Sequence, residues 1–304
     1  MVTIISHYLD SIRDNLRLDI SSEKEIISEL ETHIEDKLEE LKGTGLSEEE
    51  AANTCISLLG SAKLVARQLY EAHSQGTWWQ VLLASMPHLL FGLLFVLNWW
   101  QYVGWLSIVL ASVLIVAVYG WWHAKPAWLF PWLGYSLLPV VVAGLLLLYL
   151  PKGWSWLAIL LYIPLALWLV YWVTVQTIKR DWLYGSLMLL PIPIIIGWIV
   201  AVGWEGKFPE FNLGRLRDFA PWIGVSFLAL AVAAATFMRL RQRWLKTAVV
   251  FISGLLVLTM VVLSVGDRLG LPGFFILVLT MSVLFLIPAL LDRKVRGREQ
   301  RPMA

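Results

Sequence analysis

Charged side chains are scarce in this chain of 304 residues. Only 15% of the residues are charged, 59% are hydrophobic, and the mean hydropathy is +0.70. An ordinary soluble domain carries roughly a quarter charged residues. This shortage excludes a wholly soluble globular protein and indicates that much of the chain lies in lipid.

Cysteine is nearly absent as well. The single cysteine, Cys55, excludes an intrachain disulfide. It lies in a segment with Ala51, Ala52 and Ile56. Because a free cysteine behaves as a small hydrophobic residue, we expect Cys55 to pack in a core rather than to act as a reactive thiol.

The motifs of common enzymes are missing. The sequence contains no Walker A loop, GxSxG elbow, HExxH pair or cysteine metal cluster. Ionisable residues inside the long apolar runs are also nearly absent, which weighs against an ion-coupled transporter. We therefore expect no enzyme activity, and no catalytic, cofactor-binding or metal-binding residues.

His88 is the one deep titratable group apart from tyrosines, and it follows Pro87 in the first apolar run. It is open to two interpretations. The first interpretation is that it carries protons or binds a cofactor, as an intramembrane enzyme would require. The second, which we favour, is that it forms a hydrogen bond with a neighbouring helix. A haem would need a second deep histidine, and His123 falls at the edge of the second run.

Charge divides the chain into two parts. Residues 1–75 hold 15 acidic and 7 basic side chains, a net charge of −8, whereas residues 76–304 hold 7 acidic and 17 basic ones, a net charge of +10. All 18 tryptophans lie from Trp78 onward. The pattern predicts a small acidic helical domain over 1–75 and a membrane domain over 76–304. The first 75 residues lack a secretory signal peptide pattern, so we expect an uncleaved anchor near Trp79.

Four short helices are expected in the first domain. Apolar residues at helical spacing over 3–17 indicate the first, and those at 26, 30, 34 and 38 indicate the second. Ser22 with Glu25, and Ser47 with Glu50, match the capping box that opens a helix. Glycines at 43 and 45 end the second helix, Gly60 ends the third, and a serine at 61 opens the fourth.

The second helix carries an acidic surface. Its candidate docking residues are Glu29, His33, Glu35, Asp36, Glu39 and Glu40. One interpretation is a solvated face, and the other is a docking face for a basic protein. Direct nucleic-acid binding is disfavoured because phosphates would be repelled, and an anionic membrane surface would repel the domain as well.

Residues 23–69 read EKEIISELETHIEDKLEELKGTGLSEEEAANTCISLLGSAKLVARQL. This run resembles the HAAS-type, or permease-prefix, helical domain of bacteria. The matching elements are the segments 25–30, 33–36 and 45–51, and the Leu59-Gly60 pair before an Ala/Leu helix. The resemblance covers about a quarter of the chain. It implies a cytoplasmic signalling or docking domain ahead of membrane helices, with a protein partner such as a PadR-like regulator.

Eight apolar runs after this domain are long enough to cross about 30 Å of hydrocarbon. They cover roughly 79–99, 102–122, 128–150, 154–177, 182–204, 219–238, 246–265 and 271–291. Alternate connections hold 12 and 5 basic residues, which predicts that both termini are cytoplasmic. We therefore expect an all-α bundle of about eight spans in the bacterial cytoplasmic (inner) membrane.

Tryptophans cluster at the ends of these runs, as an aromatic belt at the membrane interface requires. Three connections share a basic residue followed three positions later by Trp-Leu, at Lys125, Lys179 and Arg241. This pattern reflects either duplication or, as we favour, basic loops beside an aromatic belt. The Pro191-Ile-Pro193 sequence should break the fifth run. The pattern of residues 205–218 predicts an outer loop with a short interfacial helix.

The sequence favours a bacterial membrane sensor or regulator whose acidic N-terminal domain docks a cytoplasmic protein. The alternative is a transport subunit, or an accessory or assembly subunit of a larger membrane protein complex. The expected partners are the lipid bilayer, a cytoplasmic protein bound by residues 1–75, and, in the alternative, membrane-protein subunits.

Overall fold

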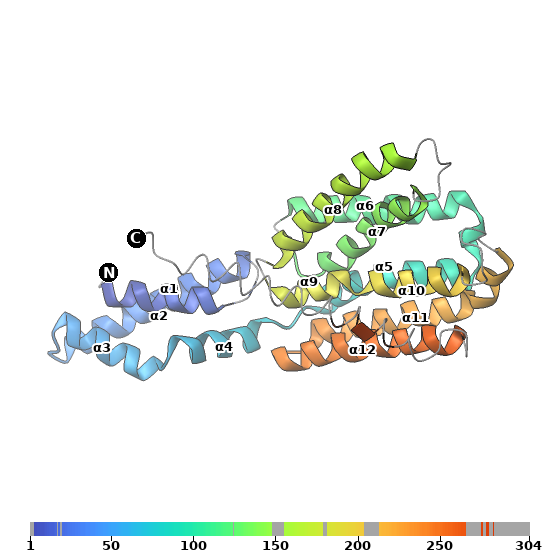
Figure 1. The fold of residues 1–304 in the computed structure, drawn as a ribbon. Coiled ribbons are helices and arrows are strands. Elements are labelled where there is room, and N and C mark those ends of the chain that lie inside the picture. Colours follow the sequence, from blue (N-terminus) through green and yellow to red (C-terminus); the bar gives the residue numbers. More distant parts are fainter. Residues whose placement is uncertain are drawn as a thin grey trace. The chain divides into compact units, whose positions relative to one another are not determined.

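The computed structural model describes residues 3–16, 18, 20–123, 125–147, 155–178, 181–203 and 213–265, with positions 275, 278, 279 and 282. Every regular element over these residues is a helix, so the all-α prediction is confirmed. The chain forms two compact units, which are described separately. We call them the N-terminal unit, which is Met1–Gly76 together with Leu240–Arg243, and the apolar unit, which is Thr77–Arg239 together with Trp244–Ala304 (Figure 1).

The N-terminal unit contains four helices around one hydrophobic core. They are α1 (Thr3–Asn15), α2 (Ile20–Gly43), α3 (Glu48–Leu59) and α4 (Ala62–His73). The core takes side chains from every one of these helices, among them Ile12, Ile34, Cys55 and Val65. Tyr8 links α1 to the end of α3, because its hydroxyl donates a 2.9 Å hydrogen bond to the carbonyl of Gly60.

Most of the predicted helix ends in this unit are confirmed. Ser47 and Glu50 form a reciprocal capping box at the start of α3, and Ser61 caps α4. Gly60 follows α3 with φ of 89°, a conformation that only glycine adopts readily. The predicted capping box at Ser22 is wrong, because α2 begins at Ile20 and places this serine inside the helix.

The apolar unit is a bundle of longer helices. Its elements are α5 (Trp78–Val96), the 3-10 turn η1 (Trp99–Gln101), α6 (Val103–Trp122), α7 (Leu129–Leu147), α8 (Ser155–Ile178), α9 (Trp182–Leu189), α10 (Pro191–Gly203), α11 (Leu213–Arg239) and α12 (Arg243–Val265). Four segments within α5, α6, α11 and α12 are long and apolar enough to cross a membrane, by length and composition. The count of eight spans stays a prediction.

Two differences from the predicted boundaries stand out. Residues 213–218, predicted as part of an outer loop, belong to the first turns of α11, while 205–212 lie outside the described residues. The predicted eighth run, 271–291, also lies outside them except at four positions. Most of the basic residues that set the predicted orientation also lie outside the described residues, including Lys152, Lys179 and Arg180.

The tightest packing in the apolar unit joins α5 to α11, which run side by side in Figure 1. Gly92 and Gly224 face each other across this contact: a Cβ on Gly92 would lie 3.5 Å from the Gly224 carbonyl oxygen. A Cβ on Gly224 would clash with Val96. Small residues let two helix backbones approach closely, which is how helices associate where lipid surrounds them.

Prolines interrupt the helices at two informative places. Pro87 lies inside α5 and has no N–H, so the carbonyl of Leu83 loses its helical donor. Trp132 on α7 replaces that donor, with its indole N–H 2.8 Å from the Leu83 oxygen. The predicted break at Pro191 is confirmed, because α9 ends at Leu189 and α10 begins at Pro191.

Candidate functional site

All six predicted docking residues lie on α2 with exposed side chains. They do not share one face. At 100° per residue, four of them form a single row that we call the α2 stripe: Glu29, His33, Asp36 and Glu40. Glu35 and Glu39 lie roughly 110° further round the helix. The structure therefore divides the predicted acidic surface into two rows.

A cavity of about 270 Å³ lies beside the α2 stripe, and we call it the α2–α3 groove. It is lined by Leu30, His33, Ile34, Lys37, Cys55, Leu58 and Leu59. Because His33 belongs to both features, the acidic row borders the groove directly. Leu58 is 65% exposed at its edge, an unusual position for a large apolar side chain in a unit with its own core.

Cys55 forms the floor of this groove and is only 2% exposed. Burial raises the pKa of its thiol above the ordinary value, and the nearby Lys37 charge offsets this in part. A raised thiol pKa disfavours the thiolate, so this cysteine is poorly suited to nucleophilic chemistry at neutral pH. The prediction that Cys55 packs in the core is confirmed.

His88 is completely buried in the apolar unit, on α5. Its Nδ1 lies 2.7 Å from the hydroxyl of Tyr135 on α7, which is the hydrogen bond to a neighbouring helix that we favoured. Its Nε2 has no hydrogen-bond partner among the described residues. Tyr135 in turn stacks on Phe91 with ring centroids 4.5 Å apart. His123 lies at the far end of α6 and bonds its own helix at Tyr119, so the two histidines do not form a pair.

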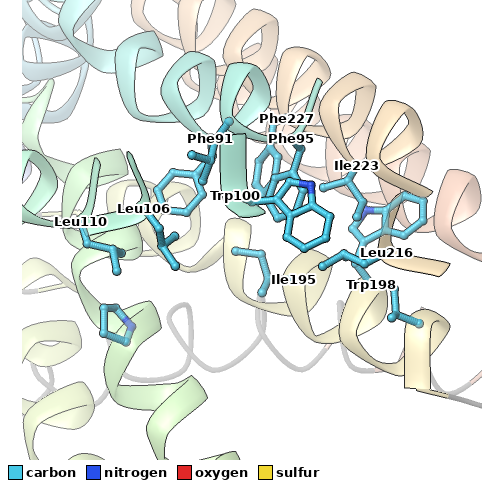
Figure 2. A pocket seen from close by; sticks show the side chains of 13 residues that line it. Phe91, Phe95, Trp100, Leu106, Leu110, Ile195, Trp198, Leu216, Ile223 and Phe227 are labelled. Carbon is cyan, nitrogen blue, oxygen red and sulfur yellow. The ribbon is translucent and has the colours of Figure 1, made fainter. Parts of the chain in front are cut away.

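An apolar cavity of about 350 Å³, which we call the aromatic pocket, lies a short way along α5 from His88. Figure 2 shows the side chains around it, which come from η1 and from α5, α6, α7, α10 and α11. Five aromatic residues line it: Phe91, Phe95, Trp100, Trp198 and Phe227. No charged side chain is among the described residues of its wall.

Two buried polar residues were missed by the sequence analysis. Asp181 directly precedes α9, and its side chain is fully buried and accepts a hydrogen bond from the backbone N–H of Leu183 at the start of α9. Lys246 is one of the 12 basic residues from which the sequence predicts the orientation, yet it is 1% exposed in α12 with its amine 5.2 Å from the ring of Phe237. A lysine at the edge of an apolar run has the same sequence pattern whether its side chain is buried or exposed.

Described residues of the apolar and N-terminal units contain no group of three or more His, Cys, Asp or Glu side chains arranged to hold a metal ion. Comparison with known protein families, curated proteins and solved structures gives no match for this chain. The resemblance to the HAAS-type domain therefore stays a prediction, and the function is argued from geometry.

Proposed function

We propose that this chain is a bacterial multi-pass membrane protein that regulates a cytoplasmic protein by binding it through the α2 stripe and the α2–α3 groove. The observation that carries the proposal is the position of an exposed, mainly acidic row along a groove whose lining is mainly apolar, with His33 and Lys37 as its polar members. A face that is only solvated needs charged side chains but no exposed apolar side chain beside them, whereas Leu58 is exposed here.

The membrane part of the proposal is supported by apolar side chains that no described part of the chain covers. On α6 only four residues are buried, and outward-facing ones include Ile108 at 56% and Ile115 at 68% exposure. An apolar surface of this extent is stable in lipid and would aggregate in water. Aromatic side chains at helix ends, such as Trp78 at 72% and Trp122 at 78%, suit the membrane interface.

The docking part rests on complementary chemistry. Fully burying a leucine side chain stabilises a complex by about 1.5–3 kcal/mol, so Leu58 can serve as an anchor for a partner. The neighbouring Glu29 and Asp36 would attract a positively charged surface and speed its association. The expected partner is therefore a basic protein that inserts an apolar side chain into the groove, and a PadR-like regulator is the candidate that the HAAS resemblance implies.

Site-specific photo-cross-linking in living cells tests this proposal. A benzoyl-phenylalanine at position 58 should form an adduct with a soluble basic protein, whereas the same residue at position 68, which is exposed on α4, should not. Adding the Glu29→Lys and Asp36→Lys substitutions should reduce the adduct about tenfold.

The matched control is the pair Glu35→Lys and Glu39→Lys, which changes the charge of α2 equally but on the other row. This pair should leave the adduct within about twofold. If both charge pairs reduce it equally, net charge and not the groove attracts the partner. If position 58 gives only membrane-protein adducts, the chain is better described as a subunit of a membrane complex.

A further inference from the structure

The aromatic pocket has properties that neither membrane packing nor the proposed docking role uses. It is a partly open cavity of about 350 Å³ in the apolar unit, within the usual size range of small-molecule sites. Protein interiors normally leave few voids larger than a water molecule. Apolar cavities of comparable size in other proteins bind apolar molecules in preference to water.

The walls indicate which class of molecule fits. Among the described residues, no charged group lines the pocket to pair with a lipid head group, so a charged or zwitterionic ligand would be desolvated without compensation from them. Rings from four elements surround the space, with Phe95 and Phe227 stacked at 6.0 Å and Phe91 tilted against Phe227 at 5.8 Å. Aromatic rings prefer offset or edge contacts with other rings, which contribute about 0.5–1.5 kcal/mol for each pair beyond area burial.

A ring-containing molecule also has an advantage over the surrounding lipid. Acyl chains are as apolar as the pocket, so burial alone gives no preference for them. A flexible chain loses conformational freedom on entering a fixed space, whereas a rigid ring system loses almost none. Selectivity then comes from shape and ring contacts.

We propose that the aromatic pocket binds an uncharged, rigid, ring-containing lipophilic molecule that reaches it through the bilayer. The inference depends only on the apolar unit and stands whether or not the N-terminal unit binds a partner. The ligand would contact other helices besides the α5–α11 pair, since Leu110 comes from α6 and Ile195 from α10.

The test uses the full chain in phosphatidylcholine nanodiscs, with free benzophenone as a photo-reactive ring probe and peptide mapping of the adducts. Adducts should concentrate on peptides that contain lining residues such as Phe91 and Leu110. Phenanthrene, a rigid molecule of fourteen carbons, should compete at a concentration about tenfold lower than tetradecane, a flexible chain of the same carbon number.

Two variants separate the pocket from the lipid-facing surface. Ile195→Trp fills the pocket and should reduce the adducts about fivefold, while Ile196→Trp, on the exposed neighbouring position, should leave them within about twofold. Leu110→Phe provides a second filling variant if the first does not fold. Phenanthrene should also raise the thermal unfolding midpoint of the wild type but not of a filled variant.

Either of two results would overturn the inference. Adducts that spread over outward-facing residues such as Ile115, with no change in the filled variants, would mean that the probe reads only the lipid interface. If tetradecane competes as well as phenanthrene, the pocket binds acyl chains of the bilayer, and the proposal of a ring-containing ligand is wrong.

Discussion

At the residue scale, single hydrogen bonds compensate for features that would otherwise weaken the helices. Pro87 removes the donor for the Leu83 carbonyl in the middle of α5, and the indole of Trp132 supplies another at 2.8 Å. An unpaired carbonyl in an apolar environment carries a large desolvation cost. Pro87 and the tryptophan on α7 therefore act together, although 45 residues separate them in the sequence.

We expect Trp132→Phe to destabilise the detergent-solubilised protein by about 1 kcal/mol, because it leaves that carbonyl without a donor. Thermal unfolding measures the change, with Trp122→Phe as a control because Trp122 is 78% exposed. The cost should shrink when Pro87→Ala is also present, since the restored N–H bonds the carbonyl from within α5. Equal costs in both backgrounds would show that lost packing, and not the hydrogen bond, sets the effect.

Cys55 offers a second test at the residue scale. Burial raises its thiol pKa, so a maleimide should label it slowly at neutral pH, and labelling should rise only above roughly pH 8.5, the ordinary thiol pKa. The control is Ser57→Cys in a Cys55→Ala background, which places an exposed thiol on the same helix. Equal labelling of the two thiols at pH 7 would contradict the burial of Cys55.

The same raised pKa links the stability of the N-terminal unit to pH. The folded state favours the neutral thiol more than the unfolded state does, so the contribution is fully present below the ordinary thiol pKa. It is lost as the pH rises through the folded pKa. Tyr8, whose pKa is also raised by burial and by Cys55, acts in the same direction at alkaline pH.

At the element scale, glycines set how closely helices approach. A Cβ on Gly134 of α7 would clash with the backbone carbonyl of Met188 on α9, an atom that cannot rotate away. The chain offers a matched control in Gly104, near the start of α6, where a Cβ would meet nothing within 4 Å.

Gly134→Ala should therefore separate α7 from α9 and lower stability by about 2 kcal/mol or more. Gly104→Ala should be neutral or slightly stabilising, because alanine has the higher helix propensity. Unfolding midpoints of the two variants in the same detergent measure the difference. Similar midpoints would mean that α7 and α9 are not packed at this glycine.

How much could be predicted from the sequence depends on how local each feature is. The Ser47–Glu50 capping box, the Gly60 helix end and the break before Pro191 are confirmed because each is decided by residues a few positions apart. The failure at Ser22 reflects the same limit, since a serine followed by glutamate does not fix the first residue of a helix.

The sites were harder to predict than the elements. The sequence identifies the acidic residues of α2, and the 100° spacing of a helix is enough to separate them into two rows. The groove beside one row depends on how α3 packs against α2. The aromatic pocket combines Phe91, Ile195 and Phe227, which lie far apart in the sequence, so periodicity could not reveal it. The burial of Lys246 could not be predicted either, because a lysine at the edge of an apolar run has the same sequence pattern whether it is buried or exposed.

At the scale of the whole molecule, the proposed membrane topology makes a direct prediction. The excess of basic residues on alternate connections predicts that residue 152 lies on the outer side of the membrane and residue 180 on the cytoplasmic side. Alkaline phosphatase fused after residue 152 should therefore be active, and a fusion after residue 180 inactive. Activity of both fusions would contradict the proposed order of spans.

The proposed regulatory role is tested most directly by recovering partners of the tagged protein in mild detergent, with the full chain beside a version lacking residues 1–75. Mass spectrometry identifies what each retains. The account predicts a soluble basic protein that is recovered with the full chain and lost with the shortened one. Recovery of the same membrane subunits with both versions, and of no soluble partner with either, would contradict it and assign the association to the apolar unit.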